Sequence, residues 1–385
     1  MLSAPATLPF LVAPCNLSWF DLYSCLFHSE MSSPLSVSSP SPARGRSWVI
    51  AVMGVAVLLL FVLDVALGSV SIPLREVIRI LLGAPSGTPG WDGIIMQIRL
   101  PKAVTALLAG AALSVGGIQM QTLFRNPLAG PSVLGITSGA SLGVAMVTLT
   151  SGSSVAAYAS QILGWSQGWL IMLAATVGAA LVLLLILWVS SRVSDYVVLL
   201  IVGIMVGNIT LSLVGIWQYF SRPEQIQSYI LWTLGSLQGV TPRHLPVLLA
   251  AVGIGLGLSF LSSKGLNALL LGENYARSLG LNVRQTRTLV ILTTSLLAGA
   301  ITGFCGPIGF VGIAVPHLTR SLLRTSDHFI LIPGVMLTGA VVLLGCDIIS
   351  QVPGSSTVLP INAITALVGS PVVIWVILKN RYAAR

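Results

Sequence analysis

Long apolar stretches recur along almost the whole chain, each between 18 and 24 residues in length. About 20 consecutive apolar residues make a helix that crosses the hydrocarbon core of a bilayer. Because backbone groups in lipid must be satisfied within their own segment, each stretch is expected to be helical. The chain is therefore predicted to be an all-α, polytopic membrane protein. We predict ten spans, at 48–67, 99–120, 131–150, 167–190, 196–217, 244–263, 288–305, 306–323, 329–349 and 361–378.

The charge content excludes an ordinary soluble domain. Only 8% of the 385 residues are charged, against about 25% in soluble proteins. The net charge of +9 comes from 19 Lys and Arg that are spread thinly over the chain. No basic tract interleaved with aromatic residues is present, which argues against nucleic-acid binding. In a membrane protein, a basic excess is more simply the enrichment of Lys and Arg on the cytoplasmic side.

The basic residues also favour ten spans over nine. The division between the seventh and eighth spans rests on Gly306 and Pro307, which interrupt the run GFCGPIGFVG. Merging these spans would move the basic C-terminal residues to the outer side. With an inner N-terminus and ten spans, thirteen basic residues lie inside and six outside, which agrees with the cytoplasmic bias. The inner set is Arg44, Arg46, Arg125, Arg192, Lys264, Arg277, Arg284, Arg287, Arg320, Arg324, Lys379, Arg381 and Arg385, and the outer set is Arg75, Arg79, Arg99, Lys102, Arg222 and Arg243.

Four shorter stretches have a predicted role in or beside the spans. The apolar spacing of 71–83 predicts a helix along the outer surface. Residues 228–239 are too short to span and indicate a re-entrant or interfacial helix. The runs GAALSVGG (110–117) and GITSGASLG (135–143) are small-residue faces for close helix packing.

A short repeat points to internal symmetry. LLAGA occurs at 107–111 and again at 296–300, with Gly117 and Gly306 at the same offset. The two copies would lie in helices of opposite direction, as in an inverted repeat around a central pathway. In a chain rich in Leu and Ala the recurrence also arises by chance, and both interpretations stay open.

The N-terminal region differs from the rest. Residues 1–47 are expected to be disordered, or to precede a true translation start at Met31, which opens a Ser/Pro-rich stretch. The four cysteines, which lack CxxC or metal-ligand spacing, are interpreted as free thiols: Cys15, Cys25, Cys305 and Cys346.

Familiar catalytic motifs are missing. There is no GxxxxGK[ST] phosphate loop and no HExxH zinc motif in the sequence. Ser138 lacks the surroundings of a nucleophile and is interpreted as a packing residue, and His317 is expected to make a local hydrogen bond. Asp64 and Asp347 lie in or near apolar spans, where carboxylates are functional candidates. Their position near the outer face is equally consistent with a structural role.

One polar segment, GENYARSLGLNVRQTR (272–287), stands out within the inner connection 264–287. Glu273 and Arg277 have the favourable i,i+4 spacing of a helical ion pair, and Gly280 suits a helix C-terminus. Apolar residues at three- and four-residue intervals predict short amphipathic helices. These features fit either a solvated loop beside lipid headgroups or a docking element for a soluble partner. The apolar residues are Leu266, Leu269, Leu270, Tyr275, Ala276 and Leu279.

Five motifs together resemble the FecCD-type permeases, the membrane subunits of ABC importers for ferric siderophores, haem and cobalamin. The resemblance covers about residues 48–380. It implies ten helices with the type II ABC importer architecture, followed by a cytoplasmic tail at 381–385, with both termini inside a bacterial cytoplasmic membrane. It further implies a second permease copy, two cytoplasmic ATPase subunits that use ATP and Mg²⁺, an outer substrate-binding protein, and no cofactor or catalysis in this chain. The motifs are RLPKAVTALLAGAAL (99–113), LFRNPLAGPSVLGITSGASLG (123–143), GENYARSLGLNV (272–283), GPIGFVGIAVPHLTR (306–320) and LPINAITALVGSP (359–371).

The resemblance assigns roles at matching positions. Arg99 and Lys102 match outer basic positions that dock the binding protein, although Lys102 replaces the commoner Arg. Gln351 stands where a third basic residue is expected, and Thr357-Val358 replaces an acidic residue before Leu359-Pro360. These departures weaken the docking assignment. The family's cytoplasmic coupling loop is matched by Gly272, Glu273, Ala276, Arg277, Leu279 and Gly280.

The expected function is ATP-driven, alternating-access import of a ferric siderophore or haem, with cobalamin as the alternative cargo. Gln119, Gln121 and Asn208 are candidates for the translocation pathway, and hydrogen bonding between helices is the competing interpretation. A secondary transporter would need ion-coupling carboxylates at mid-membrane, and a membrane enzyme would need a catalytic cluster. Neither feature is found in the sequence.

Overall fold

The structure is a computed structural model that describes residues 44–68, 70–88, 90–149, 167–193, 195–351 and 358–383. The chain divides into Met1–Gly45 and Arg46–Arg385, and the description concerns the second unit. Several predictions fall outside the described residues: the tail up to residue 43 with Met31, Cys15 and Cys25, the departure at Thr357, and the terminal Arg385.

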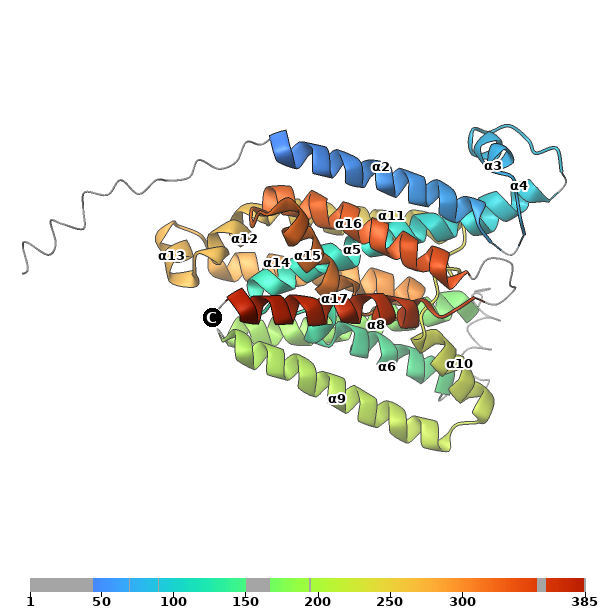
Figure 1. The fold of residues 1–385 in the computed structure, drawn as a ribbon. Helices are drawn as coiled ribbons and strands as arrows, with labels where there is room; N and C mark the ends of the chain where they lie inside the picture. The colour runs from blue at the N-terminus through green and yellow to red at the C-terminus, as the bar shows by residue number, and fades with distance from the viewer. Residues whose placement is uncertain are drawn as a thin grey trace, which may run out of the picture. The chain divides into compact units, whose positions relative to one another are not determined.

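Every regular element among the described residues is helical (Figure 1). The long helices follow the chain in the order of the predicted spans, with short helices between them. They are α2 (Arg44–Ala66), α3 (Leu74–Leu81), α4 (Trp91–Gly93), the π-helix η1 (Ile94–Arg99), α5 (Leu100–Leu123), the 3-10 helix η2 (Pro131–Leu134), α6 (Ile136–Leu149), α8 (Gln167–Arg192), α9 (Tyr196–Phe220), α10 (Pro223–Thr233), α11 (Leu245–Leu261), α12 (Ser263–Leu270), α13 (Glu273–Ser278), α14 (Val283–Cys305), α15 (Val311–Leu323), α16 (His328–Ser350) and α17 (Ile361–Ala383).

Each of the ten predicted segments coincides for most of its length with one of the long helices or with α6, α15 or α17. Among the described residues, six helical stretches are long and apolar enough to cross a bilayer alone, and α11 joined to α12 across a 48° bend makes a seventh. The remaining three are shorter: α6 has 14 residues, α15 has 13, and the apolar part of α17 is Ile361–Trp375. The predicted all-α polytopic class is confirmed. The apolar parts of α6, α15 and α17 are shorter than those of the other seven spans.

The predicted break at Gly306 is confirmed. Helix α14 ends at Cys305, and α15 does not begin until Val311. Gly306 and Phe310 both have positive φ, at 75° and 65°. Because left-handed backbone cannot continue an α-helix, these two residues enforce the turn between the seventh and eighth helices.

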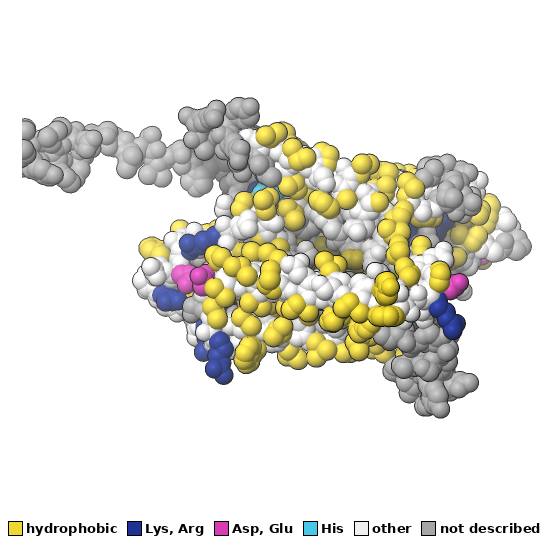
Figure 2. All heavy atoms as spheres, turned by 90° about the horizontal axis from the view of Figure 1, so that it is seen from below, with side chains coloured by type: hydrophobic (Ala, Val, Ile, Leu, Met, Phe, Trp, Pro, Cys, Tyr) yellow, Lys and Arg dark blue, Asp and Glu magenta, His cyan; other side chains and the backbone are white. Residues whose placement is uncertain are grey.

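The ends of the helices form two separate sets of connections (Figure 1). At one end, Arg284 donates to the carbonyl of Ser191 at 3.4 Å, and Arg125 donates to the carbonyl of Leu269 at 3.3 Å. Figure 2 shows hydrophobic side chains along the flank of the bundle, with charged side chains gathered toward its ends. This arrangement agrees with an apolar belt in lipid between two polar faces.

Helix α5 lies at the centre of the bundle and packs closely on its neighbours. A Cβ atom added to Gly110 would lie 2.2 Å from the carbonyl oxygen of Gly339 in α16, and one on Gly117 would lie 1.8 Å from that of Gly312 in α15. In α6, a Cβ atom added to Gly143 would lie 2.0 Å from the carbonyl oxygen of Ala174 in α8. Both predicted small-residue faces are therefore helix contacts, because only a residue without a side chain leaves room for the facing backbone.

The helices that contain the two LLAGA copies, α5 and α14, run in opposite directions (Figure 1). This is the relation that an inverted repeat requires, and the repeat itself stays a prediction.

The two predicted peripheral helices differ in outcome. Helix α3 confirms the predicted helix within 71–83, with Val77 and Ile80 buried, and its place on the outer surface stays a prediction. The predicted helix at 228–239 stops halfway, since α10 ends at Thr233. Gly235 adopts φ 73°, and Ser236 N–H donates to the Cys305 carbonyl at 2.8 Å. This turn ends the helix and ties the chain to the end of α14.

Candidate functional site

The predicted inner connection 264–287 consists of two short helices, the first of which begins one residue earlier at Ser263, and the start of a long one. Residues 263–287 are called the inner segment, and their inner location stays a prediction. Helix α12 is anchored by buried Leu266 and Leu269, and α13 by Ala276, which is fully buried. Gly272 joins α12 to α13 with φ 112°. The predicted amphipathic helices are therefore present.

Gly280 ends α13 as the spacing predicted. Its φ is 82°, its N–H donates to the Arg277 carbonyl at 2.9 Å, and Leu281 N–H donates to the Ala276 carbonyl at 3.0 Å. This pair of bonds is the Schellman arrangement, which satisfies carbonyls at a helix end and needs a left-handed residue.

Glu273 forms ion pairs with two arginines. The guanidinium of Arg277 lies 3.2 Å from one carboxylate oxygen, and that of Arg287 lies 3.4 Å from the other. Arg287 is buried and also donates to the carbonyl of Val193 at 3.1 Å, just beyond the end of α8. Glu273 therefore ties α13 to α14, and Arg287 extends the tie to α8, whereas Arg277 stays exposed.

Large apolar side chains are exposed on the same segment. Leu270, Leu271, Tyr275 and Leu279 are between 46% and 64% exposed. Apolar side chains grouped among charges at a membrane protein's polar face are typical of a protein-docking surface. Beside them is an open hollow of about 550 Å³, lined by Arg125, Asp195, Leu271, Gly272, Glu273, Asn274 and Tyr275.

At the opposite end, Lys102 is part of a buried polar cluster. Its Nζ lies 2.8 Å from Asp347 Oδ2 and 3.6 Å from Asp64 Oδ1. Gln351 Nε2 donates to Asp64 Oδ1 at 2.6 Å and to Asp347 Oδ2 at 3.2 Å. All four side chains are buried. The cluster joins α2, α5 and α16, so both carboxylates have a structural role.

Arg99 is engaged in the same region. Its guanidinium donates to the carbonyls of Val65 and Ala66, at 3.1 and 2.8 Å, and to that of Val70. The residue is only 5% exposed. In this arrangement neither Arg99 nor Lys102 presents its charge to the outer surface, which weighs against the docking role predicted for them. Sequence reasoning missed this because the partners lie 29 to 34 residues away for Arg99 and on two other helices for Lys102.

Gln119 and Gln121 bridge helices. Gln119 Oε1 accepts from the Thr293 and Thr294 hydroxyls at 3.1 and 2.9 Å, and its Nε2 donates to Ser262 Oγ at 3.2 Å. Gln121 Nε2 donates to the Ile313 carbonyl at 3.2 Å. Both glutamines are buried. These contacts favour the interpretation as bonds between helices over the pathway.

Asn208 has the opposite environment. It is exposed near the middle of α9, and Ser212, one turn further on, is exposed on the same side. Such polar groups are costly in contact with lipid. Asn208 is therefore the pathway candidate that the geometry retains.

Two smaller predictions also have a structural outcome. His317 Nε2 lies 2.7 Å from the Pro127 carbonyl. The predicted hydrogen bond is therefore present, but its partner is 190 residues away in the sequence and not local. Cys305 and Cys346 are free and buried. Within the described ranges, no group of three His, Cys, Asp or Glu residues is placed to hold a metal ion.

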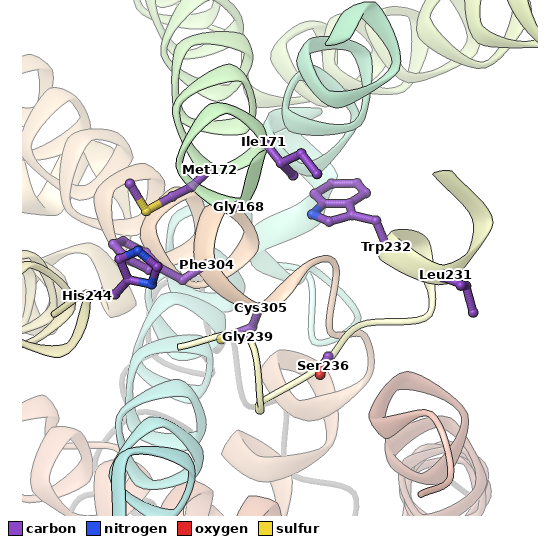
Figure 3. A pocket seen from close by; sticks show the side chains of 11 residues that line it. Gly168, Ile171, Met172, Leu231, Trp232, Ser236, Gly239, His244, Phe304 and Cys305 are labelled. Atoms are coloured by element: carbon purple, nitrogen blue, oxygen red, sulfur yellow. The ribbon is translucent and has the colours of Figure 1, made fainter. Parts of the chain in front are cut away.

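A small pocket lies between α8, α14 and the chain that follows α10 (Figure 3). Its volume is about 190 Å³, and its lining includes Met172, Trp232, His244, Phe304 and Cys305. His244 packs edge-on against Trp169, with ring centroids 4.4 Å apart. Because ligand sites usually exceed about 300 Å³, this pocket is too small for a metal chelate.

Comparison with known proteins identifies the architecture. The sequence profile of the FecCD transport family matches residues 56–379. The chain belongs to the FecCD transport family. It is thus a permease subunit of the ABC importer type and not itself an enzyme.

Individual FecCD relatives agree with this assignment. The vitamin B12 import system permease protein BtuC of Klebsiella pneumoniae is 36% identical over 353 residues, which cover 91% of this chain and 99% of the relative. The protein of the same name from Citrobacter koseri is 36% identical over 288 residues, or 74% of this chain and 83% of the relative. A solved structure described as an inward-facing conformation of a putative metal-chelate type ABC transporter superposes with a TM-score of 0.74 at 27% identity, covering 86% of this chain and 99% of the other.

Proposed function

We propose that this FecCD chain is the permease of an ATP-driven importer in a bacterial cytoplasmic membrane, and that the inner segment couples it to a cytoplasmic ATPase. The observation that carries the proposal is the composition of this segment's surface. Exposed Leu271, Tyr275 and Leu279 project from two helices whose other faces are buried in the bundle. A soluble partner that covers them gains apolar contact and holds the bundle by a rigid attachment.

The coupling mechanism follows from the contacts below that surface. Glu273 is held by Arg277 and Arg287, and Arg287 also holds the carbonyl of Val193. A push on α13 therefore reaches α14 and the end of α8 together. The helices then rock as nearly rigid bodies, and the cargo's cavity opens alternately to the two sides.

We place the translocation pathway along α9. Asn208 lies exposed in its central turns, and lipid offers its side-chain amide no hydrogen-bond partner. Ser212, one turn further on, is exposed too, and its hydroxyl donates to the backbone carbonyl of Asn208 at 3.0 Å. A second copy of the permease facing this side of α9 would enclose the two residues in a polar passage. Cargo delivered by an outer binding protein would need little affinity there.

For the cargo we propose a metal chelate, with cobalamin as the first candidate. The BtuC relatives described above carry vitamin B12 in their names. This favours cobalamin, which the sequence analysis gave as the alternative cargo, over a ferric siderophore or haem. The similarity to a putative metal-chelate type transporter supports the wider class, with ferric siderophores and haem as the second candidates.

Uptake and co-purification test the proposal together. The permease, expressed with its genomic ATPase and binding protein, is expected to co-purify with the ATPase and to import labelled cobalamin in exchange for ATP hydrolysis. Leu279→Glu is expected to reduce both the amount of co-purified ATPase and the rate of cobalamin import at least about tenfold, since it places a charge in the apolar contact. Leu82→Glu is the matched control, because Leu82 is 81% exposed in the outer connection.

The cargo is read from competition among cobalamin, an iron-labelled hydroxamate siderophore and haemin. Uptake of a siderophore or haemin alone would overturn the first candidate and keep the permease assignment. Uptake that continues without the ATPase would overturn the coupling mechanism itself.

A further inference from the structure

The end of α5 at residues 119–122 carries three polar side chains that contact helices α14, α15 and α16 and the bend between α11 and α12. Gln119 bonds Thr293 and Thr294 of α14, and Ser262 at the bend before α12. Gln121 Oε1 accepts from Arg320 of α15 at 2.7 Å. Thr122 Oγ1 lies 2.9 Å from His328 Nε2 at the start of α16. We call residues 119–122 the α5 hub.

Asn267 links the inner segment to the first turn of α16. Its Nδ2 donates to Asp327 Oδ1 at 2.7 Å, and its Oδ1 accepts from the backbone N–H of His328 at 2.8 Å. Asp327 in turn caps α16 by accepting from Phe329 N–H at 3.0 Å. Because only the NH₂ group can face a carboxylate, the orientation of the Asn267 amide is fixed.

The ring of His328 completes a path from Asn267 to the hub. Its Nδ1 lies 2.7 Å from Asn267 Oδ1, so this nitrogen carries the proton and donates. In the neutral ring Nε2 is then the acceptor, and the Thr122 hydroxyl donates to it. The chain of bonds runs from α12 through His328 to α5.

Burial makes this path stiff. His328 has no exposed surface and Thr122 is 4% exposed, so water cannot replace the bond between these two side chains. Asn267, at the other end of the path, is half-buried. Neighbouring Leu266 and Leu269 are also buried, which holds α12 against the bundle while α13 presents its exposed face.

We infer that Asn267 and His328 are positioning residues that transmit displacement of the inner segment to the α5 hub, and through it to α14, α15 and α16. The inference rests on the proposed coupling function and adds the route by which the movement reaches the central helix. The role of Asn267 and His328 is to keep α12 and α5 moving as one body.

Hydrogen exchange on the purified permease in nanodiscs tests the link without any partner. Thr122→Val removes the hydroxyl and keeps the shape. It is expected to raise exchange in α12 by about fivefold, the factor expected for one lost buried hydrogen bond, although Thr122 lies on another helix. Thr122→Ser keeps the hydroxyl and is expected to restore protection. Thr148→Val is the matched control, since the Thr148 hydroxyl bonds only within α6. Unchanged exchange in α12 for Thr122→Val and Asn267→Ala would overturn the inference.

Transport by the complete complex tests the consequence. Asn267→Ala and Thr122→Val are expected to retain ATP hydrolysis while the cobalamin imported per ATP falls by about fivefold, within the range of measured coupling energies. Thr148→Val, whose lost hydroxyl bonds within α6, is again the control and is expected to keep the normal ratio.

The other possible results of the transport experiment distinguish the inference from the proposed function. An unchanged ratio, or hydrolysis and import that fall in parallel, would assign the two residues a merely structural role and overturn the inference. A wild-type complex that neither hydrolyses ATP nor imports any of the three chelates would overturn the proposed function, and the exchange measurement would still decide the link.

Discussion

Lys102 Nζ lies 2.8 Å from Asp347 Oδ2, in a contact where the two side chains are 4% and 5% exposed. Asp64, which has no exposed surface, lies 3.6 Å from the same nitrogen, and Arg99 supplies a second cation nearby. Lys102 thus forms ion pairs with both carboxylates, whereas the Arg99 guanidinium bonds to backbone carbonyls. A buried charge whose partner is removed costs far more than the pair itself contributes.

Lys102→Met is accordingly expected to destabilise the protein by about 3–5 kcal/mol, the usual cost of breaking a buried ion pair. Thermal unfolding in detergent, followed by tryptophan fluorescence, measures the effect. Lys264→Met is the control, since Lys264 is exposed. If Lys102 served only to dock a binding protein, the variant would unfold like the wild type and lose only affinity for that protein.

A Gly→Ala change at the contact between α5 and α16 is expected to have the opposite effect on stability from one at an open position in α2. Gly110→Ala places a methyl group 2.2 Å from the carbonyl oxygen of Gly339, so the helices must separate, at a cost of about 1–3 kcal/mol or more. Gly54 in α2 has no atom within 4 Å of the added Cβ, and Gly54→Ala is expected to stabilise by roughly 0.5–1 kcal/mol. Comparable unfolding temperatures for the two variants would contradict the close packing of α5.

The two arginines on Glu273 are expected to differ in their effect on stability. Arg277 is 58% exposed in its pair, and exposed pairs contribute only about 0–1 kcal/mol. Arg277→Glu should therefore leave unfolding almost unchanged while it reduces co-purification of the ATPase. Arg287→Met should lower stability clearly, because it releases both Glu273 and the Val193 carbonyl. Equal losses of stability would contradict this division.

The pathway along α9 predicts water access at a single face. In the assembled complex, Asn208→Cys is expected to react with a charged, membrane-impermeant thiol reagent, with labelling of the parent chain subtracted. Leu59→Cys in α2 is the lipid-facing control, at 65% exposure for Leu59, and should react at least about tenfold more slowly, since thiolates do not form in lipid. Equal reaction rates would place Asn208 outside the pathway.

Periodicity and composition predicted most of the fold from the sequence. Long apolar runs gave the helices, and Gly306 with Pro307 gave the break that the left-handed backbone at Gly306 and Phe310 enforces. The end of α10 at Thr233 was missed, because it depends on a contact between Ser236 and Cys305 that is remote in sequence.

The candidate site was predictable only where its contacts are local. The Glu273–Arg277 pair and the turn at Gly280 lie within one helix, so their spacing carried the information. The burial of Lys102 was not predictable in that way, although Asp64, Asp347 and Gln351 were each noticed separately. Likewise, nothing in the spacing joins Asn267 to His328, which is 61 residues away.

The enclosure of Arg99 and Lys102 has a consequence for the recognition of a delivery protein. The sequence resemblance predicts that basic residues at these two positions meet acidic residues on the incoming protein. Because both side chains are enclosed, we predict that basic contacts to such a protein come instead from exposed cations at this end of the bundle, such as Arg75, Arg222 and Arg243. A delivery protein borrowed from a relative would therefore dock poorly, and this permease and its own delivery protein should be exchangeable between organisms only as a matched set.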